Sequence, residues 1–71
     1  MAKVVIYTKD GCPYCSAAVK YYNQKGFEIE EINTSHDAKA RQKIIDEYDA
    51  DKVPVIFEDG KFVSIGFRGG G

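Results

Sequence analysis

Blocks of apolar and polar positions along the chain predict three elements in its first half. Residues 3–8 contain a continuous apolar, β-branched run, which is typical of a strand covered on both faces. Residues 13–25 place apolar side chains at helical spacing, and Gly26 is well placed to end that helix. Residues 27–32 begin by alternating apolar with acidic side chains, which predicts a second strand whose far end the alternation does not define.

A second helix is expected after the polar segment 33–37, which is rich in capping side chains. Thr34 and Asp37 have the spacing of a capping box, in which two side chains satisfy free N–H groups at a helix start. The helix should continue to about Tyr48. Its predicted inner face consists of Ile44, Ile45 and Tyr48.

The last part of the pattern predicts a hairpin. Two apolar runs, residues 55–57 and 62–65, flank an Asp-Gly pair, which is a strong local signal for a tight turn between two strands. The predicted order is therefore β-α-β-α-β-β, an α/β fold. A right-handed βαβ unit makes the first two strands parallel.

Length and composition restrict the class of protein. The 71 residues leave room for one domain, and 44% hydrophobic with 30% charged residues suits a soluble globular chain. We expect residues 1–68 to form this domain and residues 69–71, all glycine, to form a flexible tail. A net charge of -1 gives no general attraction to nucleic acid or membranes. The apolar stretch near the N-terminus is too short for a signal peptide or membrane span, so a cytoplasmic protein is expected. Nothing in the sequence argues for more than a monomer.

The only two cysteines, Cys12 and Cys15, lie where the first strand passes into the first helix. Cys12 would occupy the N-cap and Pro13 the first helical position, which proline favours. The free N–H groups and the helix dipole then favour a Cys12 thiolate, the nucleophile of thiol–disulfide exchange. Cys15, one turn on, can resolve a mixed disulfide. Lys9 adds positive charge nearby.

Two other interpretations of the cysteines are open. They could form half of a zinc site, but two further ligands are needed, and the chain has one histidine, His36. Only a dimer could complete such a site, so no metal is expected. They could also be inert buried thiols, although that would not account for Pro13 directly after a cysteine that opens a helix.

The run Tyr-Thr-Lys-Asp-Gly-Cys-Pro-Tyr-Cys at residues 7–15 resembles the active-site segment of dithiol glutaredoxins, and Val53-Pro54 matches that family's Val-Pro element. The resemblance covers nearly the whole chain. It implies a minimal thioredoxin-like fold with a four-stranded mixed sheet, in which the hairpin is antiparallel to the central strand. It also implies a cis bond before Pro54, beside Cys12. The implied activity is glutathione-dependent reduction of protein disulfides and glutathione mixed disulfides.

The same resemblance implies how glutathione binds, as a co-substrate. Val53 would pair with the tripeptide through its backbone, like an added strand. Lys9 and Tyr14 would line the site, and Arg41 would reach the glycyl carboxylate. Each side chain also has a simpler explanation: a surface charge for Lys9, packing over the helix start for Tyr14, and a solvated helix face for Arg41. The full implied set is Lys9, Tyr14, Arg41, Val53, Pro54, Gly66 and Phe67.

Two departures from the family affect the expected function. Lys52 stands where glutaredoxins usually have threonine, which adds positive charge at the rim. After Gly66, Phe67 replaces a second glycine, and no third helix is expected to hold the γ-glutamyl carboxylate of glutathione. The run Gly66-Phe67-Arg68 resembles the small redoxins that reduce ribonucleotide reductase and are recharged by thioredoxin reductase.

Three functions therefore remain open. The first is a glutaredoxin acting on disulfide-containing or glutathionylated proteins, and the second is a redoxin that donates electrons to ribonucleotide reductase. The third is a protein that holds an iron–sulfur cluster between two chains through Cys12 and glutathione.

Overall fold

A computed structural model describes residues 2–50 and 52–66 of the chain. The elements are β1 (Lys3–Thr8), α1 (Pro13–Gln24), β2 (Glu28–Asn33), α2 (Ala38–Tyr48), β3 (Val55–Glu58) and β4 (Lys61–Ile65). The strands form one sheet in the order β2-β1-β3-β4. β1 is parallel to β2 and antiparallel to β3, and β4 is antiparallel to β3. The predicted element order, the mixed sheet and the antiparallel hairpin are confirmed.

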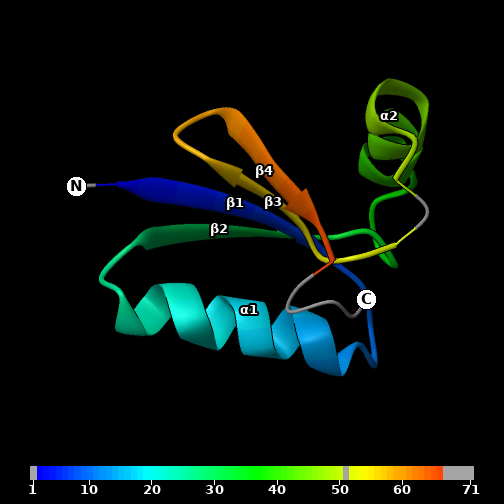
Figure 1. Ribbon diagram of the computed structural model, residues 1–71. Coiled ribbons are helices and arrows are strands. Elements are labelled where there is room, and N and C mark those ends of the chain that lie inside the picture. Colours follow the sequence, from blue (N-terminus) through cyan, green and yellow to red (C-terminus); the bar gives the residue numbers. More distant parts are fainter. Residues whose placement is uncertain (1, 51, 67–71) are drawn as a thin grey trace.

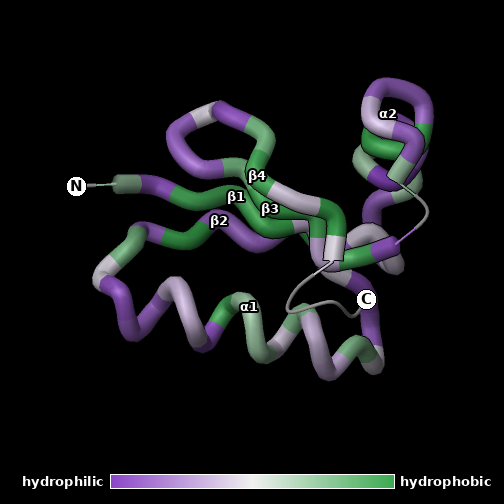
Figure 2. Tube along the Cα trace, viewed as in Figure 1, coloured by the Kyte–Doolittle hydropathy of each residue, from purple (hydrophilic) through white to green (hydrophobic). Residues whose placement is uncertain are grey.

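The core lies on both faces of the sheet, because side chains alternate along β1. On one face Val4 and Ile6, both fully buried, pack with Ala18 and Tyr22 of α1. On the other face Tyr7 belongs to a cluster that includes side chains of α2 and β3. The two helices lie on opposite sides of the sheet (Figure 1). Hydrophobic positions concentrate in the strands, whereas the helices carry many hydrophilic ones (Figure 2).

Strand pairing and backbone geometry set the observed boundaries. β2 runs one residue later than expected, because its register against β1 pairs Lys3 with Glu28 and Thr8 with Asn33. The Asp-Gly turn of the hairpin is confirmed, with φ of 51° at Asp59 and 82° at Gly60. Positive φ at both central positions is what a two-residue type I′ turn requires. Both hairpin strands therefore extend one residue further toward the turn than the apolar runs indicated.

The predicted capping box at the start of α2 is wrong. The N-cap is Asp37, whose Oδ1 accepts a hydrogen bond from the backbone N–H of Ala40 at 3.0 Å. Thr34 is buried instead, and its hydroxyl donates to the carbonyl oxygen of Thr8 at 2.7 Å. The hydroxyl of Thr34, which the capping-box spacing assigned to the helix start, therefore makes a tertiary contact with the end of β1 instead.

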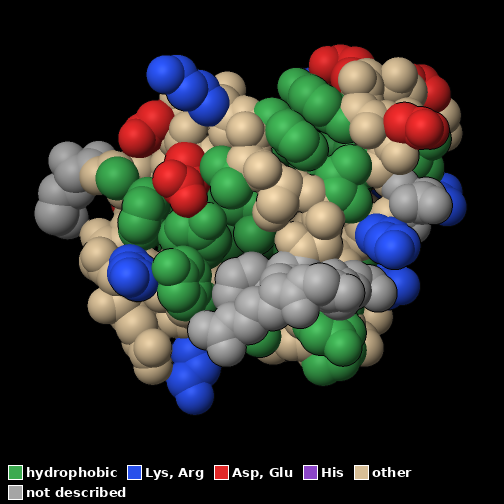
Figure 3. Space-filling view, in the orientation of Figure 1, with side chains coloured by type: hydrophobic (Ala, Val, Ile, Leu, Met, Phe, Trp, Pro, Cys, Tyr) green, Lys and Arg blue, Asp and Glu red, His purple; other side chains and the backbone are tan. Residues whose placement is uncertain are grey.

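The predicted inner face of α2 is confirmed only in part. Ile44 is buried, whereas Tyr48 is 36% exposed. Tyr48 packs against the hairpin, stacked on Phe62 with ring centroids 5.4 Å apart and edge-on to Phe57. Hydrophobic side chains accordingly gather on the surface between α2 and the hairpin (Figure 3). Tyr48 therefore shields the hairpin at the surface rather than filling the core.

Neither described helix combines the length and the apolar character needed to cross a membrane.

Replacing the observed cap should weaken the fold. We expect Asp37→Ala to lower the free energy of unfolding by about 1 kcal/mol, because the N–H of Ala40 loses its acceptor. Urea denaturation followed by circular dichroism measures this difference. Lys39→Ala, at an exposed position in the first turn of the same helix, is the control and should change stability little. Equal losses in the two variants would contradict Asp37 as the cap.

Candidate functional site: two thiols at a helix start

Cys12 occupies the N-cap of α1, and Pro13 is the first helical residue, as predicted. The Cys12 backbone is extended, with φ of -98° and ψ of 106°, so its side chain turns back toward the helix start. The backbone N–H of Cys15 donates to Cys12 Sγ at 3.2 Å. The sulfur therefore acts as a helix cap, and this donor also stabilises negative charge on it.

Cys15 has a different chemical environment from Cys12. Both thiols are free and buried. Burial and then a hydrogen bond with the Cys12 side chain raise the pKa of the Cys15 thiol to about 12, opposed by a hydrogen bond from the Lys9 backbone. Cys15 is therefore a neutral thiol at neutral pH. At this site the sulfur of Cys12 accepts a hydrogen bond from a helix N–H group, and the protonated thiol of Cys15 lies three residues further on. This arrangement suits attack on a disulfide by Cys12 and resolution of the resulting mixed disulfide by Cys15.

The segment before β3 lies against Cys12. The Val53–Pro54 bond is cis, in agreement with the resemblance, and the thiol of Cys12 donates to the carbonyl oxygen of Val53 at a long 3.9 Å. Pro54 is fully buried, and its carbonyl oxygen accepts the N–H of Gly66 at 2.7 Å. This hydrogen bond joins the end of β4 to the segment that borders Cys12 Sγ.

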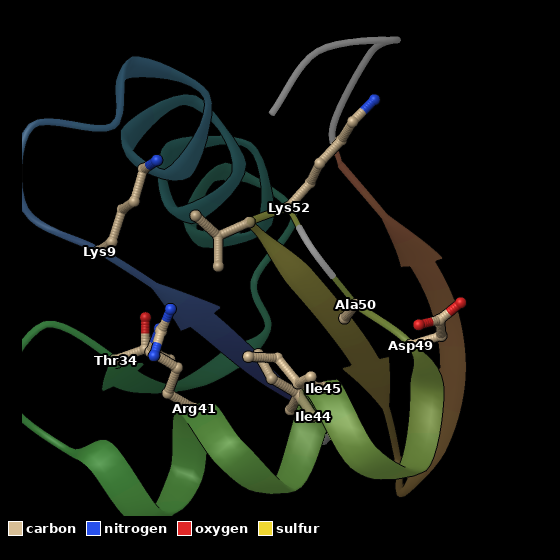
Figure 4. A pocket seen from close by; sticks show the side chains of 9 residues that line it. Lys9, Thr34, Arg41, Ile44, Ile45, Asp49, Ala50 and Lys52 are labelled. Carbon is tan, nitrogen blue, oxygen red and sulfur yellow. The ribbon is translucent and has the colours of Figure 1, made fainter.

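A cavity of about 340 Å³ opens beside Val53. Three cationic side chains from three segments line it: Lys9 follows β1, Arg41 belongs to α2, and Lys52 precedes Val53 (Figure 4). Asp49, at the end of α2, lies across the cavity from Lys9 (Figure 4). We call this space the cationic cavity. An anionic ligand in this cavity would lie beside Val53, whose carbonyl oxygen is 3.9 Å from Cys12 Sγ.

A second cavity, of about 440 Å³, contains both thiols in its lining. Its charged side chains include Asp10 and Glu31 as well as Lys9, which borders both cavities. Lys9 therefore lies between a region rich in positive charge and one that contains two carboxylates. The two cavities differ in charge, so a substrate in each would meet different electrostatic surroundings.

A hydrogen-bond network fixes the segment that carries Cys12. The carbonyl oxygen of Thr8 accepts both the N–H and the hydroxyl of Thr34, each at 2.7 Å. Asp10 receives a hydrogen bond from Asn33 at 2.9 Å, and its Oδ2 lies 2.9 Å from His36 Nε2. The sequence pattern assigned residues 33–36 to helix capping and missed this role. Only the parallel pairing of β1 with β2 brings the two loops together.

The structure does not bring all the predicted residues together. Lys9, Arg41 and Val53 line the cationic cavity, whereas Tyr14 is 43% exposed and lines neither cavity described above. Gly66 is buried beside Pro54 with a φ of 86°. Phe67, Arg68 and the expected glycine tail lie outside the described residues. Lys52 and Asp49 also border the cationic cavity, and the positive charge of Lys52 was the sequence signal for it.

No metal-binding group forms among residues 2–50 and 52–66, where no three His, Cys, Asp or Glu side chains cluster suitably for an ion. His36, the histidine considered as a zinc ligand, pairs with Asp10 and is largely exposed. The described residues thus contain no partner set that completes a zinc site around Cys12 and Cys15.

Comparison with known proteins gives consistent matches. A family model described as glutaredoxin matches residues 4–63. The chain is 36% identical over 63 residues to glutaredoxin 3 of Escherichia coli K12, covering 89% of this chain and 76% of that protein. Glutaredoxin 1 of Francisella tularensis, crystallised with cacodylate, has a TM-score of 0.77 at 32% identity, covering 94% of this chain and 85% of its own. A thioredoxin-like protein also has a TM-score of 0.77, at 29% identity over 87% of this chain and 85% of its own. The predicted thioredoxin-like fold is confirmed.

The raised pKa of Cys15 can be tested by alkylation. In a Cys12→Ser variant, we expect the rate of Cys15 modification by iodoacetamide to keep rising past about pH 10, because only the thiolate reacts and burial disfavours it. The same variant unfolded in urea is the control, and its rate should level off above roughly pH 9, near the ordinary thiol pKa. A native-state plateau at the same pH as in urea would contradict the assignment.

Proposed function

The chain belongs to the glutaredoxin family and is a thiol–disulfide oxidoreductase, and we propose that its co-substrate is glutathione, with which it reduces protein disulfides and glutathione mixed disulfides. One observation carries the proposal: Val53 lines the cationic cavity, and its carbonyl oxygen lies 3.9 Å from Cys12 Sγ. An extended peptide beside Val53 could pair with its backbone and bring a cysteine sulfur to Cys12. Its carboxylate would then be near Lys9 and Arg41.

In this proposal Cys12 is the nucleophile. Its thiolate attacks one sulfur of a glutathione mixed disulfide, a Cys12–glutathione disulfide forms, and the other thiol leaves as a thiolate that takes up a proton. A second glutathione thiolate then attacks the glutathione sulfur of that adduct. This step releases oxidised glutathione and restores the Cys12 thiolate. The N–H of Cys15 stabilises the sulfur whenever it carries charge.

Protein disulfides require Cys15 as well. Cys12 attacks the disulfide and forms a mixed disulfide with the protein, which leaves the protein's second sulfur as a thiolate. Cys15 then loses its proton, attacks Cys12 Sγ, and releases the protein's first sulfur, so that a Cys12–Cys15 disulfide remains. The short separation compensates for the small thiolate fraction of Cys15, since an intramolecular attack has a high effective concentration. Glutathione then reduces the internal disulfide.

The proposed glutathione set keeps Lys9, Arg41 and Val53 as direct contacts. Pro54 positions Val53, and the N–H of Gly66, directly after β4, donates to the carbonyl oxygen of Pro54. Tyr14 would reach the ligand from the exposed surface of the first helical turn. Such chemistry depends on a pool of reduced glutathione, so we place the protein in the cytoplasm.

A second candidate is the redoxin that thioredoxin reductase recharges. The Gly66-Phe67-Arg68 run favours it, whereas the Pro-Tyr pair between the cysteines favours the glutaredoxin. We favour the glutaredoxin because Pro13 and Tyr14 adjoin the reacting sulfur. The two functions differ in the reductant that regenerates the dithiol, and that difference can be measured.

Substitution of the two cysteines should separate the two reactions. Cys12→Ser should lower both by roughly a thousandfold or more, because the nucleophile is lost. Cys15→Ser should retain turnover of a glutathione mixed disulfide and lose turnover of a protein disulfide. NADPH consumption coupled to glutathione and glutathione reductase measures both activities. Ala17→Ser, at an exposed position of α1, is the control for substitution in the same helix. Full activity of Cys12→Ser would overturn the choice of nucleophile.

The recharging system can be identified with the oxidised wild-type protein. We expect NADPH to be consumed with glutathione and glutathione reductase, because the cationic cavity suits the anionic tripeptide. Turnover with thioredoxin reductase and none with glutathione would replace the glutaredoxin proposal by the redoxin one.

A further inference from the structure

Among the residues that the structure describes, the positive side chains of the cationic cavity have no acidic partner in an ion pair. Within the described part of the chain, Lys9, Arg41 and Lys52 form no ion pair, whereas Lys3 pairs with Glu30 and His36 pairs with Asp10. The described residues of the cavity lining include these three cations and one carboxylate, that of Asp49. Among the described residues, the positive charge that lines the cavity therefore exceeds the negative charge.

Lys52 differs from the other two cations in its place along the chain. It immediately precedes Val53, whose carbonyl oxygen lies 3.9 Å from Cys12 Sγ. A ligand that pairs with the Val53 backbone must therefore pass alongside Lys52. Lys9 and Arg41 approach the same ligand from other segments, after β1 and from α2 (Figure 4). The three cations thus border the cavity from three separate segments.

We propose that the cationic cavity selects disulfide substrates by the negative charge of the half that lies in it, and that Lys52 is the residue that adds discrimination beyond Lys9 and Arg41. This inference rests on the proposed glutathione-dependent function. It states that the site recognises the negative charge of its substrate. Thiols with two free carboxylates are preferred over the same thiols with masked carboxylates. A protein substrate is preferred when acidic residues flank its cysteine on the side of the cavity.

The physical basis is an exposed Coulomb interaction. Lys52 is solvent-exposed, so water and salt screen its charge. One exposed ion pair changes an affinity by roughly 1.5- to 5-fold. The effect should act on substrate binding, because the ammonium group of Lys52 interacts with the ligand and not with the reacting sulfur. It should therefore appear in KM and leave kcat little changed.

The test compares two substrates that differ in the charge of their carboxyl groups. One is the mixed disulfide of glutathione with a small neutral thiol, and the other carries the glutathione diethyl ester. For the wild type, kcat/KM should be higher for the free acid. In Lys52→Thr, we expect this preference to shrink by about threefold, through a higher KM for the free acid. Adding salt to the wild type should reduce the preference in the same direction.

Two controls separate the possible outcomes. Lys20→Thr removes one positive charge from the exposed surface of α1 and should keep the full preference, while Lys52→Arg should also keep it because the charge is retained. An undiminished preference in Lys52→Thr would overturn the inference while leaving glutathione dependence intact. A wild type that reduces neither substrate would instead overturn the proposed function. A loss as large in Lys20→Thr as in Lys52→Thr would assign the effect to net charge and overturn the role of Lys52.

Discussion

The hydrogen bond from the Cys15 amide to Cys12 Sγ is the interaction on which the site depends. It makes one sulfur both the cap of α1 and the reacting atom, so the start of the helix and the position of the nucleophile are fixed together. Pro13 supports this arrangement, because a proline at the first helical position needs no acceptor for its nitrogen. Cys15 is then held one turn further on, buried and protonated, where it can reach Cys12 without a change of fold.

The remaining elements converge on that helix start. β1 is covered on both faces, and its last carbonyl oxygen, that of Thr8, is bound by both the amide and the hydroxyl of Thr34. The segment before β3 arrives from the opposite side and places Val53 against Cys12. Three loops that are distant in sequence therefore form one site at the end of β1. The charges that they bring are unequal, with cations on the side of Val53 and carboxylates of Asp10 and Glu31 on the other.

The sequence was sufficient wherever a local rule governed the structure. The apolar run of β1, the Asp-Gly turn and the order Cys12-Pro13 each have one dominant physical explanation, and all three predictions are confirmed. It was insufficient where a side chain had both a local and a distant partner. Thr34 bonds to Thr8 instead of capping α2, and Tyr48 stacks on the hairpin instead of entering the core. The cationic cavity is likewise a product of tertiary structure, since its lysines and arginine are far apart in sequence.

The most direct test of this account is a crystal structure of the Cys15→Ser variant after reaction with oxidised glutathione. We expect a disulfide between glutathione and Cys12, with the tripeptide extended beside Val53 and a carboxylate in the cationic cavity near Lys9 and Arg41. A tripeptide that lies in the second cavity, beside Asp10 and Glu31, would contradict the proposed binding site. Failure of the variant to form any adduct would contradict Cys12 as the nucleophile.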